Sequence, residues 1–245
     1  MSAESEAEWA DEWAGEEDDP DSDGGEGQTD GDEDDGDEES QPPPGPPATP
    51  PAPATPPTGS TLQWSHFRVV ATPPRAGGED AQIGYTRAGS GQFTFDVPTV
   101  LLVDGMYYAS WGSYSAGMVY SVRFNPATSW VVRGNQDAGL LEHERLHLLI
   151  AEYVAQKISA KYPTISGHGS GAALTREEAL SKARADAAAQ LKARFDQVVA
   201  EWARIDTAVQ TRYDAQTMHG SDPFNQLWWK DDYKAEVDKE FPVGP

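Results

Sequence analysis

Hydrophobic periodicity divides the chain after residue 60 into a strand-rich part and a helical part. Up to residue 134, short runs of aromatic and β-branched residues recur, with spacers too short for crossover helices. We therefore expect four to six strands there, mostly antiparallel. Asp104-Gly105 is typical of a turn between two of them. The runs that predict strands are 62–70, 93–97, 99–103, 118–124 and 129–133.

From residue 136 onward the hydrophobic period becomes that of helices. Residues 140–161 contain neither Gly nor Pro, and we expect Pro163 and the glycine-rich stretch 167–171 to end this first helix. Thr175 is typical of the cap of a second helix that continues to about residue 212. A third helix is predicted over residues 222–240. The folded body, residues 61–245, is therefore predicted to be α+β, with long C-terminal helices.

The N-terminal part of the chain has a different composition. The formal charge is −23, of which −20 belongs to residues 1–40, so the rest of the chain is close to neutral. A segment so acidic and so poor in apolar residues cannot bury enough surface to fold, and we expect a disordered acidic tail. Residues 41–60 hold ten prolines and are predicted to form an extended Pro-rich linker.

Composition also excludes several classes of function. The chain has no cysteine, which excludes disulfides, thiolate metal sites and a cysteine nucleophile. The body has no basic excess of the kind nucleic-acid binding needs, and no apolar run long enough to span a membrane is visible. No Sec signal peptide is recognisable at the N-terminus. We expect a soluble protein, cytoplasmic or exported by a non-classical route.

The chemistry is concentrated in His143-Glu144-Arg145-Leu146-His147. In a helix, positions i and i+4 lie on one face, so His143 and His147 can ligate one Zn²⁺ while Glu144 reaches a water that the metal activates. Glu144 is the predicted general base. The alternative, a chance pattern on a solvated helix, is disfavoured by the leucines that flank both histidines.

A catalytic zinc site needs a third protein ligand and an open position. Glu152 follows His143 by nine residues, which places it on the opposite side of an unbroken helix, so we expect it to be structural. The residues alone leave four candidates on or just beyond the second helix. They are Glu201, Asp206, Asp214 and His219.

A second polar cluster, Tyr213-Asp214-Ala-Gln-Thr217-Met-His219-Gly220, carries a resemblance to a known family. Together with Trp64, Phe67, Phe124, Ser129-Trp130, the zinc motif with Leu140-Leu141-Glu142, Ala151-Glu152-Tyr153, Gln226 and Trp228, it resembles bacterial secreted zinc-dependent proteases known mainly as domain of unknown function 922. The resemblance covers most of residues 62–235. Arg145, where Gln is expected, and Leu148, where an aromatic residue is expected, depart from the pattern, as does the missing signal peptide.

The resemblance implies a zincin-like fold and a zinc-dependent metallopeptidase. It favours His219 as the third ligand, with Asp214 orienting a metal-bound imidazole. The reverse assignment is also consistent, with Asp214 as ligand and His219 or Tyr213 stabilising an oxyanion. Strand 129–133 either binds an extended protein or peptide substrate at a sheet edge or is a core strand with Trp130 buried.

Two other functions remain open from the sequence. In one, zinc only staples helices together in a non-catalytic binding module; in the other, the protein is an injected or secreted toxin effector with the same chemistry. Trp9 and Trp13 lie one helical turn apart in the acidic tail, a spacing used for docking into partner grooves. The tail could therefore bind a secretion or injection apparatus, or another partner.

Overall fold

A computed structural model describes residues 55–74 and 79–241. The chain divides into two units, Met1–Thr55 and Pro56–Pro245, and the described residues belong almost entirely to the second. The predicted acidic tail with Trp9 and Trp13, and most of the predicted Pro-rich linker, lie outside the described residues.

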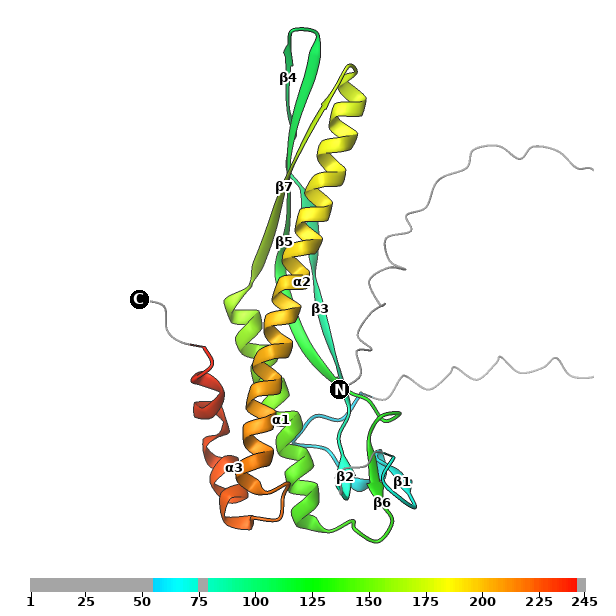
Figure 1. Cartoon of the computed structure of the whole chain (residues 1–245), viewed down its shortest axis with the longest axis vertical. Helices are drawn as coiled ribbons and strands as arrows, with labels where there is room; N and C mark the ends of the chain where they lie inside the picture. The colour runs from blue at the N-terminus through cyan, green and yellow to red at the C-terminus, as the bar shows by residue number, and fades with distance from the viewer. Residues whose placement is uncertain (1–54, 75–78, 242–245) are drawn as a thin grey trace, which may run out of the picture. The chain divides into compact units, whose positions relative to one another are not determined.

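The second unit is α+β, with antiparallel strand pairs and long C-terminal helices, which confirms the predicted class (Figure 1). It begins with a short 3₁₀ helix, Trp64–His66. Seven strands are present among the described residues, and six of them precede residue 134, at the upper end of the expected range. They are β1 (Arg68–Val70), β2 (Ala81–Gln82), β3 (Tyr85–Phe95), β4 (Thr99–Val103), β5 (Met106–Phe124), β6 (Trp130–Val132) and β7 (Thr164–Ala173).

Three short strands form a small sheet in the order β1-β6-β2. β6 pairs in parallel with β1 and antiparallel with β2, so it is the central strand. Trp130 and Val131 are buried. The interpretation of residues 129–133 as a substrate-binding edge is therefore wrong, and the core-strand alternative is confirmed.

A longer antiparallel sheet is organised around the 19-residue strand β5. β3 pairs with residues 113–124 of β5, β4 with residues 106–110, and β7 with residues 107–116. Because one strand has only two edges, the overlaps place β3 and β4 on one side of β5 and β7 on the other. The hairpin of β4 and β5 extends to the upper end of the view in Figure 1.

β7 contains the glycine-rich stretch that we expected to end the first helix. Gly167, Gly169 and Gly171 alternate along the strand and face helix α2 (Arg176–Thr217). A Cβ on Gly169 would lie 2.1 Å from the carbonyl oxygen of Ala183, inside the helix backbone. The glycines therefore serve as contact surface for α2, whose facing residues are alanines with fully buried side chains.

Three helices carry the rest of the unit: α1 (Ala138–Lys161), α2, and α3 (Pro223–Asp238). Thr175 caps α2, as predicted, by accepting a hydrogen bond from the amide of Glu178. α2 continues to Thr217, beyond the predicted end near residue 212. Among the described residues, none of the helices combines the length and apolar character required to cross a bilayer.

The main core fixes α1 against α2. Ile150, Val154 and Ile158 of α1 are fully buried in the same cluster as Trp202 and Val209 of α2. These residues recur at three- and four-residue spacing, so one stripe of each helix faces the other. The stripe on α1 continues toward its N-terminus into Leu146 and the histidine pair, and the packing thereby brings the end of α2 beside them.

Candidate metal centre

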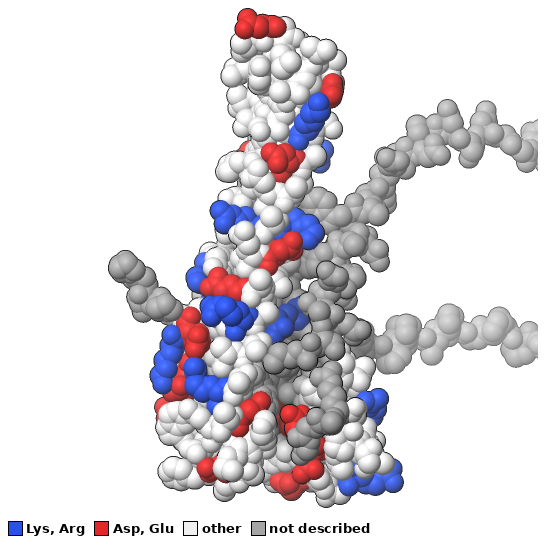
Figure 2. All heavy atoms as spheres, in the orientation of Figure 1, with Lys and Arg blue, Asp and Glu red and all other residues white. Residues whose placement is uncertain are grey.

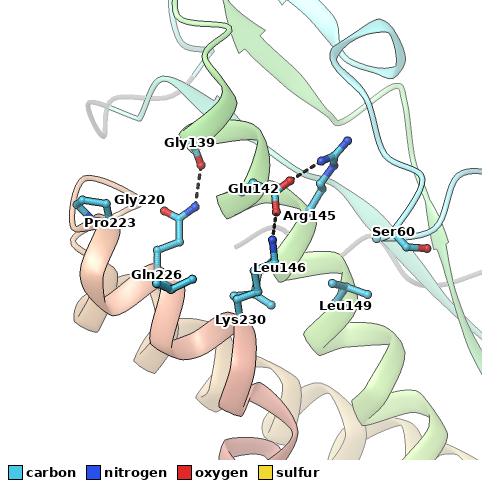
Figure 3. Close-up of a pocket in the computed structure, with 12 residues that line it drawn as sticks. Ser60, Gly139, Glu142, Arg145, Leu146, Leu149, Gly220, Pro223, Gln226 and Lys230 are labelled. Atoms are coloured by element: carbon cyan, nitrogen blue, oxygen red, sulfur yellow. Dashed lines mark hydrogen bonds and ion pairs between the residues drawn. The ribbon is translucent and has the colours of Figure 1, made fainter.

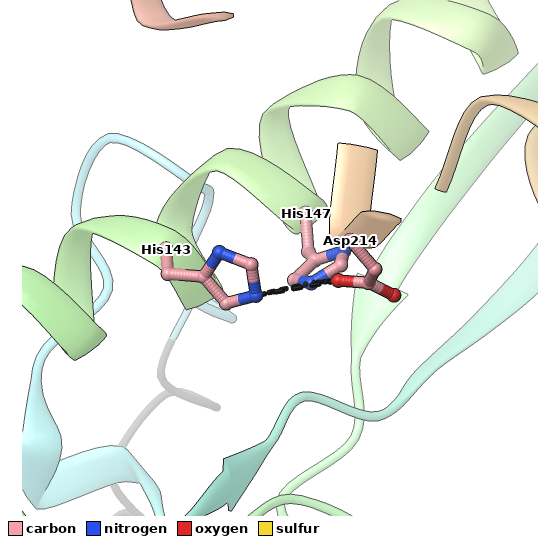
Figure 4. Close-up of side chains that lie close together, drawn as sticks. All are labelled: His143, His147 and Asp214. Atoms are coloured by element: carbon pink, nitrogen blue, oxygen red, sulfur yellow. Dashed lines mark hydrogen bonds and ion pairs between the residues drawn. The ribbon is translucent and has the colours of Figure 1, made fainter. Parts of the chain in front are cut away.

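His143 and His147 lie one turn apart on α1 and point toward each other (Figure 4). Their ring centroids are 4.6 Å apart, and the two Nε2 atoms are separated by 3.0 Å. His143 is buried and His147 nearly so. Both imidazoles therefore offer one nitrogen to the same small volume.

Asp214, near the C-terminal end of α2, completes a three-residue group with the histidines. Its Oδ1 lies 2.9 Å from Nε2 of His147 and 3.3 Å from Nε2 of His143. The three ligand atoms are all within 4.8 Å of one another. Two imidazole nitrogens and one carboxylate oxygen form a donor set suited to a divalent metal ion, and their convergence is the observation that fits one.

Gln210, one turn before Asp214 on α2, fixes the orientation of the His147 ring. The amide nitrogen of Gln210 donates to the backbone carbonyl of His147 (2.9 Å) and to Oδ1 of Asp206 (3.1 Å), both of which only accept. Its Oε1 must then accept from Nδ1 of His147, 2.5 Å away. His147 therefore carries a proton on Nδ1, so Nε2 is the nitrogen that faces Asp214 and His143, and it donates to the carboxylate when the ring is protonated.

Gln210 is itself held by a buried polar network beneath the site. Asp206 is fully buried, accepts a hydrogen bond from the Tyr85 hydroxyl (2.7 Å), and forms an ion pair with Arg87 (2.6 Å). Burial, with the charge of Asp206, raises the pKa of Tyr85 well above its usual value, so the hydroxyl stays a donor. β3 thus supports, through Asp206 and Gln210, the tautomer of a histidine on α1.

The electrostatics of the group favour positive charge between the rings. Burial lowers the pKa of His143. Burial acts the same way on His147, but hydrogen bonding and charge from Asp214 outweigh it and raise the pKa to about 9. Burial acts to raise the pKa of Asp214, yet the two imidazoles hold it well below its usual range. The carboxylate remains ionised and is directed at the point where the imidazole nitrogens meet.

Glu144 lies beside the group in a buried position. Burial raises the pKa of its carboxyl to about 7, against the lowering effects of His147 and of the Ile83 backbone. Its Oε2 has no hydrogen-bond partner among the described residues. A buried carboxyl with an unpartnered oxygen and a pKa of about 7 can accept a proton near neutral pH.

Tyr213 and Gly220 enclose His143. The Tyr213 ring stacks on the imidazole with centroids 4.7 Å apart, and its hydroxyl donates to the carbonyl of His143 (3.3 Å). Tyr213 is fully buried, and burial raises its pKa far above the ordinary value. Gly220 has φ of +82°, and a Cβ there would lie 3.0 Å from Cγ of His143. In this structure Tyr213 therefore holds His143 in position.

His219, favoured by the family resemblance as third ligand, lies outside the three-residue group. Its side chain is 61% exposed, and Nδ1 is 3.9 Å from Oδ1 of Asp214. Met218, His219 and Gly220 all have positive φ, so α2 ends in three consecutive left-handed residues. This turn directs His219 outward while Asp214, still within the helix, faces the histidines.

The other candidate ligands have structural partners. Glu201 bonds to Lys161 and Tyr162, and Asp206 belongs to the network around Gln210. Glu152 accepts a hydrogen bond from the amide of Gly59, in keeping with the predicted structural role.

Sequence reasoning missed Gln210 and the supporting role of Asp206. The available signal was their spacing: Asp206, Gln210 and Asp214 recur every four residues and so share one face of α2. Glutamine is uncommon as a metal ligand, and its function here is to orient one.

A cavity of about 510 Å³ adjoins the centre between α1 and α3 (Figure 3). Glu142 lies on its wall and bonds to both Arg145 and Lys230, so one carboxylate stands between two cations there. Gly220 lines the cavity and also contacts His143. The cavity therefore opens beside the histidine pair. The remaining wall includes Ser60, Leu146, Leu149, Gln226 and Leu227.

Comparisons with known proteins add no relative. No protein-family model matches the chain, and no curated protein or solved structure matches it. The resemblance to the zinc-protease family stays a prediction that rests on the residues quoted for it.

Proposed function

We propose that this protein is a zinc-dependent hydrolase that cleaves peptide bonds, with His143, His147 and Asp214 as the metal ligands. The proposal rests on two features that occur together. Three side chains offer ligand atoms to one point, and Glu144, next to His143 in the sequence, has a buried Oε2 without a partner among the described residues. Three protein ligands are the number that leaves Zn²⁺ an open position.

Each residue has a defined part. Zinc bound here would supply a Lewis acid that polarises a substrate carbonyl and activates water. Glu144 accepts the proton of the attacking water at Oε2 and returns it to the leaving amine. Gln210 keeps the proton of His147 on Nδ1, and Tyr213 holds the His143 ring by stacking and by its bond to the backbone.

The small sheet supports a peptide as the substrate. Strand β2 lies at the end of the order β1-β6-β2 and pairs only with β6 among the described residues. Ile83 follows it directly, and its backbone lies close enough to Glu144 to lower the pKa of that carboxyl. An extended peptide that pairs with the outer edge of β2 would run past Glu144, with its main chain bound by the strand.

A specific observation favours a second candidate function, a structural zinc site that joins two helices without catalysing a reaction. His219 is 3.9 Å from Asp214, and a change of its rotamer would bring a fourth ligand to the metal. Four protein ligands close a zinc site and make it structural. In that case the ion would join the end of α2 to α1 without catalysing a reaction.

The two candidates are separated by metal analysis combined with a cleavage assay on the full chain. We expect about one zinc per chain in the wild type, loss of zinc in His143→Ala and in Asp214→Ala, and retention in His219→Ala. Cleavage of casein or a peptide library should be lost in Glu144→Gln with zinc retained. Glu152→Gln, the same change on the same helix at a residue bonded to Gly59, is the matched control.

Zinc loss in His219→Ala without any cleavage by the wild type would favour the structural zinc site and overturn the peptidase. Cleavage that survives in Glu144→Gln would remove Glu144 from the reaction.

A further inference from the structure

The outer strand of the long sheet has an unpaired edge far from the histidine pair. Among residues 55–74 and 79–241, β4 pairs with β5 alone. Its sequence, Thr99-Val-Leu-Leu-Val103, contains no charged residue. Leu101, Leu102 and Val103 are 61%, 59% and 49% exposed. Uncharged apolar edge strands are the kind that pair with another chain, and proteins normally shield them with charge or proline.

The turn that follows β4 determines which backbone groups face outward. Asp104 and Gly105 have φ of +50° and +80°, the signature of a two-residue type I′ turn. Such a turn is closed by a hydrogen-bonded pair, here Val103 with Met106. Hydrogen-bonded positions alternate along the strand, so the amides and carbonyls of Val100 and Leu102 point away from β5.

We propose that β4 pairs antiparallel with β4 of a second copy of this chain, about a two-fold axis at Leu101. In this register Val100 of one copy exchanges two hydrogen bonds with Leu102 of the other, and the symmetry doubles them to four. The two Leu101 residues then form a non-hydrogen-bonded pair, with Cα atoms about 4.5 Å apart. The pairing is isologous, because each copy contributes the same five residues.

Side chains on both faces fit this pairing. On one face, Leu101 already pairs with the half-exposed Tyr108 on β5, so the two copies align four apolar side chains in a row. On the other face, the exposed Leu102 meets Val100 of the second copy. α2 packs chiefly on β7 and β5, which leaves room beside β4.

Charge favours a second copy over a membrane surface. Figure 2 shows the hairpin end as largely uncharged, with acidic atoms at its extremity. Asp104 would lie opposite Pro98 of the second copy and about 20 Å from the other Asp104, so the two hairpin tips do not repel each other at close range. Glu177 and Glu178, in the first turn of α2, follow the nearby end of β7 and lie beside Arg176 and Lys182, so this end has no basic excess to attract an anionic lipid surface.

The register can be tested by cross-linking, since the chain contains no cysteine. Leu101→Cys should form a disulfide-linked dimer under mild oxidation, because the paired Cα distance lies within the range of disulfides. Leu174→Cys is the matched control: Leu174 is 75% exposed and lies outside β4. We expect cross-linking of Leu101→Cys to be more than about tenfold faster, as pre-association raises the effective thiol concentration.

Cross-linking between two different cysteine variants tests the register of the pairing further. Residues 99 and 103 face each other across the proposed axis, so Thr99→Cys and Val103→Cys should cross-link when mixed and not separately. Equal rates for Leu101→Cys and Leu174→Cys would overturn the pairing, and self-cross-linking of Val103→Cys would overturn the register.

Sedimentation of the full chain provides an independent measurement. The wild type should show a concentration-dependent dimer between about 1 and 100 µM, and Leu101→Lys should remain monomeric because it places like charges at the axis. Its zinc content should equal that of the wild type, which separates this result from the proposed activity. A monomeric wild type overturns the proposal. Leu101-dependent binding to phosphatidylcholine–phosphatidylglycerol vesicles by a monomeric chain would assign the strand to membranes instead.

Discussion

Replacing Gln210 by Met tests whether the metal centre depends on a residue that does not touch the metal. Methionine has similar volume but removes both the Oε1 acceptor for Nδ1 of His147 and the Nε2 donor to the His147 carbonyl. The ring then loses the hydrogen bond that selects its tautomer. We expect weaker zinc binding with the fold retained.

The magnitude follows from the type of bond that is lost. When zinc is bound, the ion polarises the neutral His147 ring, so its Nδ1–H bond to Gln210 resembles a hydrogen bond to a charged group, which contributes about 1.5–3 kcal/mol. This corresponds to a dissociation constant about 10- to 150-fold higher, which agrees with the roughly 10- to 100-fold effects of removing such orienting partners elsewhere.

The assay is competition for Zn²⁺ with a chromophoric chelator. Gln190→Met makes the same change on α2, about 30 Å away along the helix, where the side chain bonds only to Asp186 among the described residues. It should leave zinc affinity unaltered. In a His147→Ala background, Gln210→Met should have no further effect, because its influence passes through that ring. A dissociation constant within about twofold of the wild type would refute the reasoning.

Three further predictions concern the packing that holds the site. Gly169→Ala places a Cβ against the α2 backbone and should lower the free energy of unfolding by about 2 kcal/mol in urea titration, whereas Ser170→Ala, on the exposed face of β7, should leave it nearly unchanged; equal effects would contradict the close contact. Arg87→Met leaves Asp206 buried without its cation and should lower stability by about 3 kcal/mol, an effect that should largely disappear when Asp206 is replaced by Asn as well. Burial raises the pKa of Tyr120 from 10.0 to about 12, so the stability it contributes is complete below pH 10 and is lost as the pH rises toward 12. Tyr120→Phe, which removes a buried hydroxyl without a partner among the described residues, should therefore lose less stability than the wild type between about pH 10 and pH 12, and an equal loss would contradict this assignment.

Sequence patterns predicted those features of the fold that depend only on residues close together in the chain. The cap at Thr175, the glycine- and proline-free run of α1 and the four-residue spacing of the histidines depend only on neighbours within one or two turns. The α+β class follows from the change of hydrophobic period near residue 136. These features can be read from one sequence because helices are local structures.

The features that the sequence did not reveal depend on partners distant in the chain. Glycines at 167, 169 and 171 predicted only the end of a helix, and they form a strand because β7 pairs with β5 along its whole length while alanines on α2 pack against the glycines. The central position of β6 is set by β1 and β2, more than 45 residues earlier. Likewise, the positions of Asp214 and His219 relative to the histidines depend on where α2 ends and on the left-handed turn after it.

The unbroken length of α2 sets a distance within the molecule. The helix has 42 residues, and at about 1.5 Å per residue its first residue lies about 57 Å from Asp214. A folded domain of about 100 residues has a radius of gyration of about 13 Å. A protein of that size can therefore bind beside the histidines while another occupies the hairpin end, and neither excludes the other.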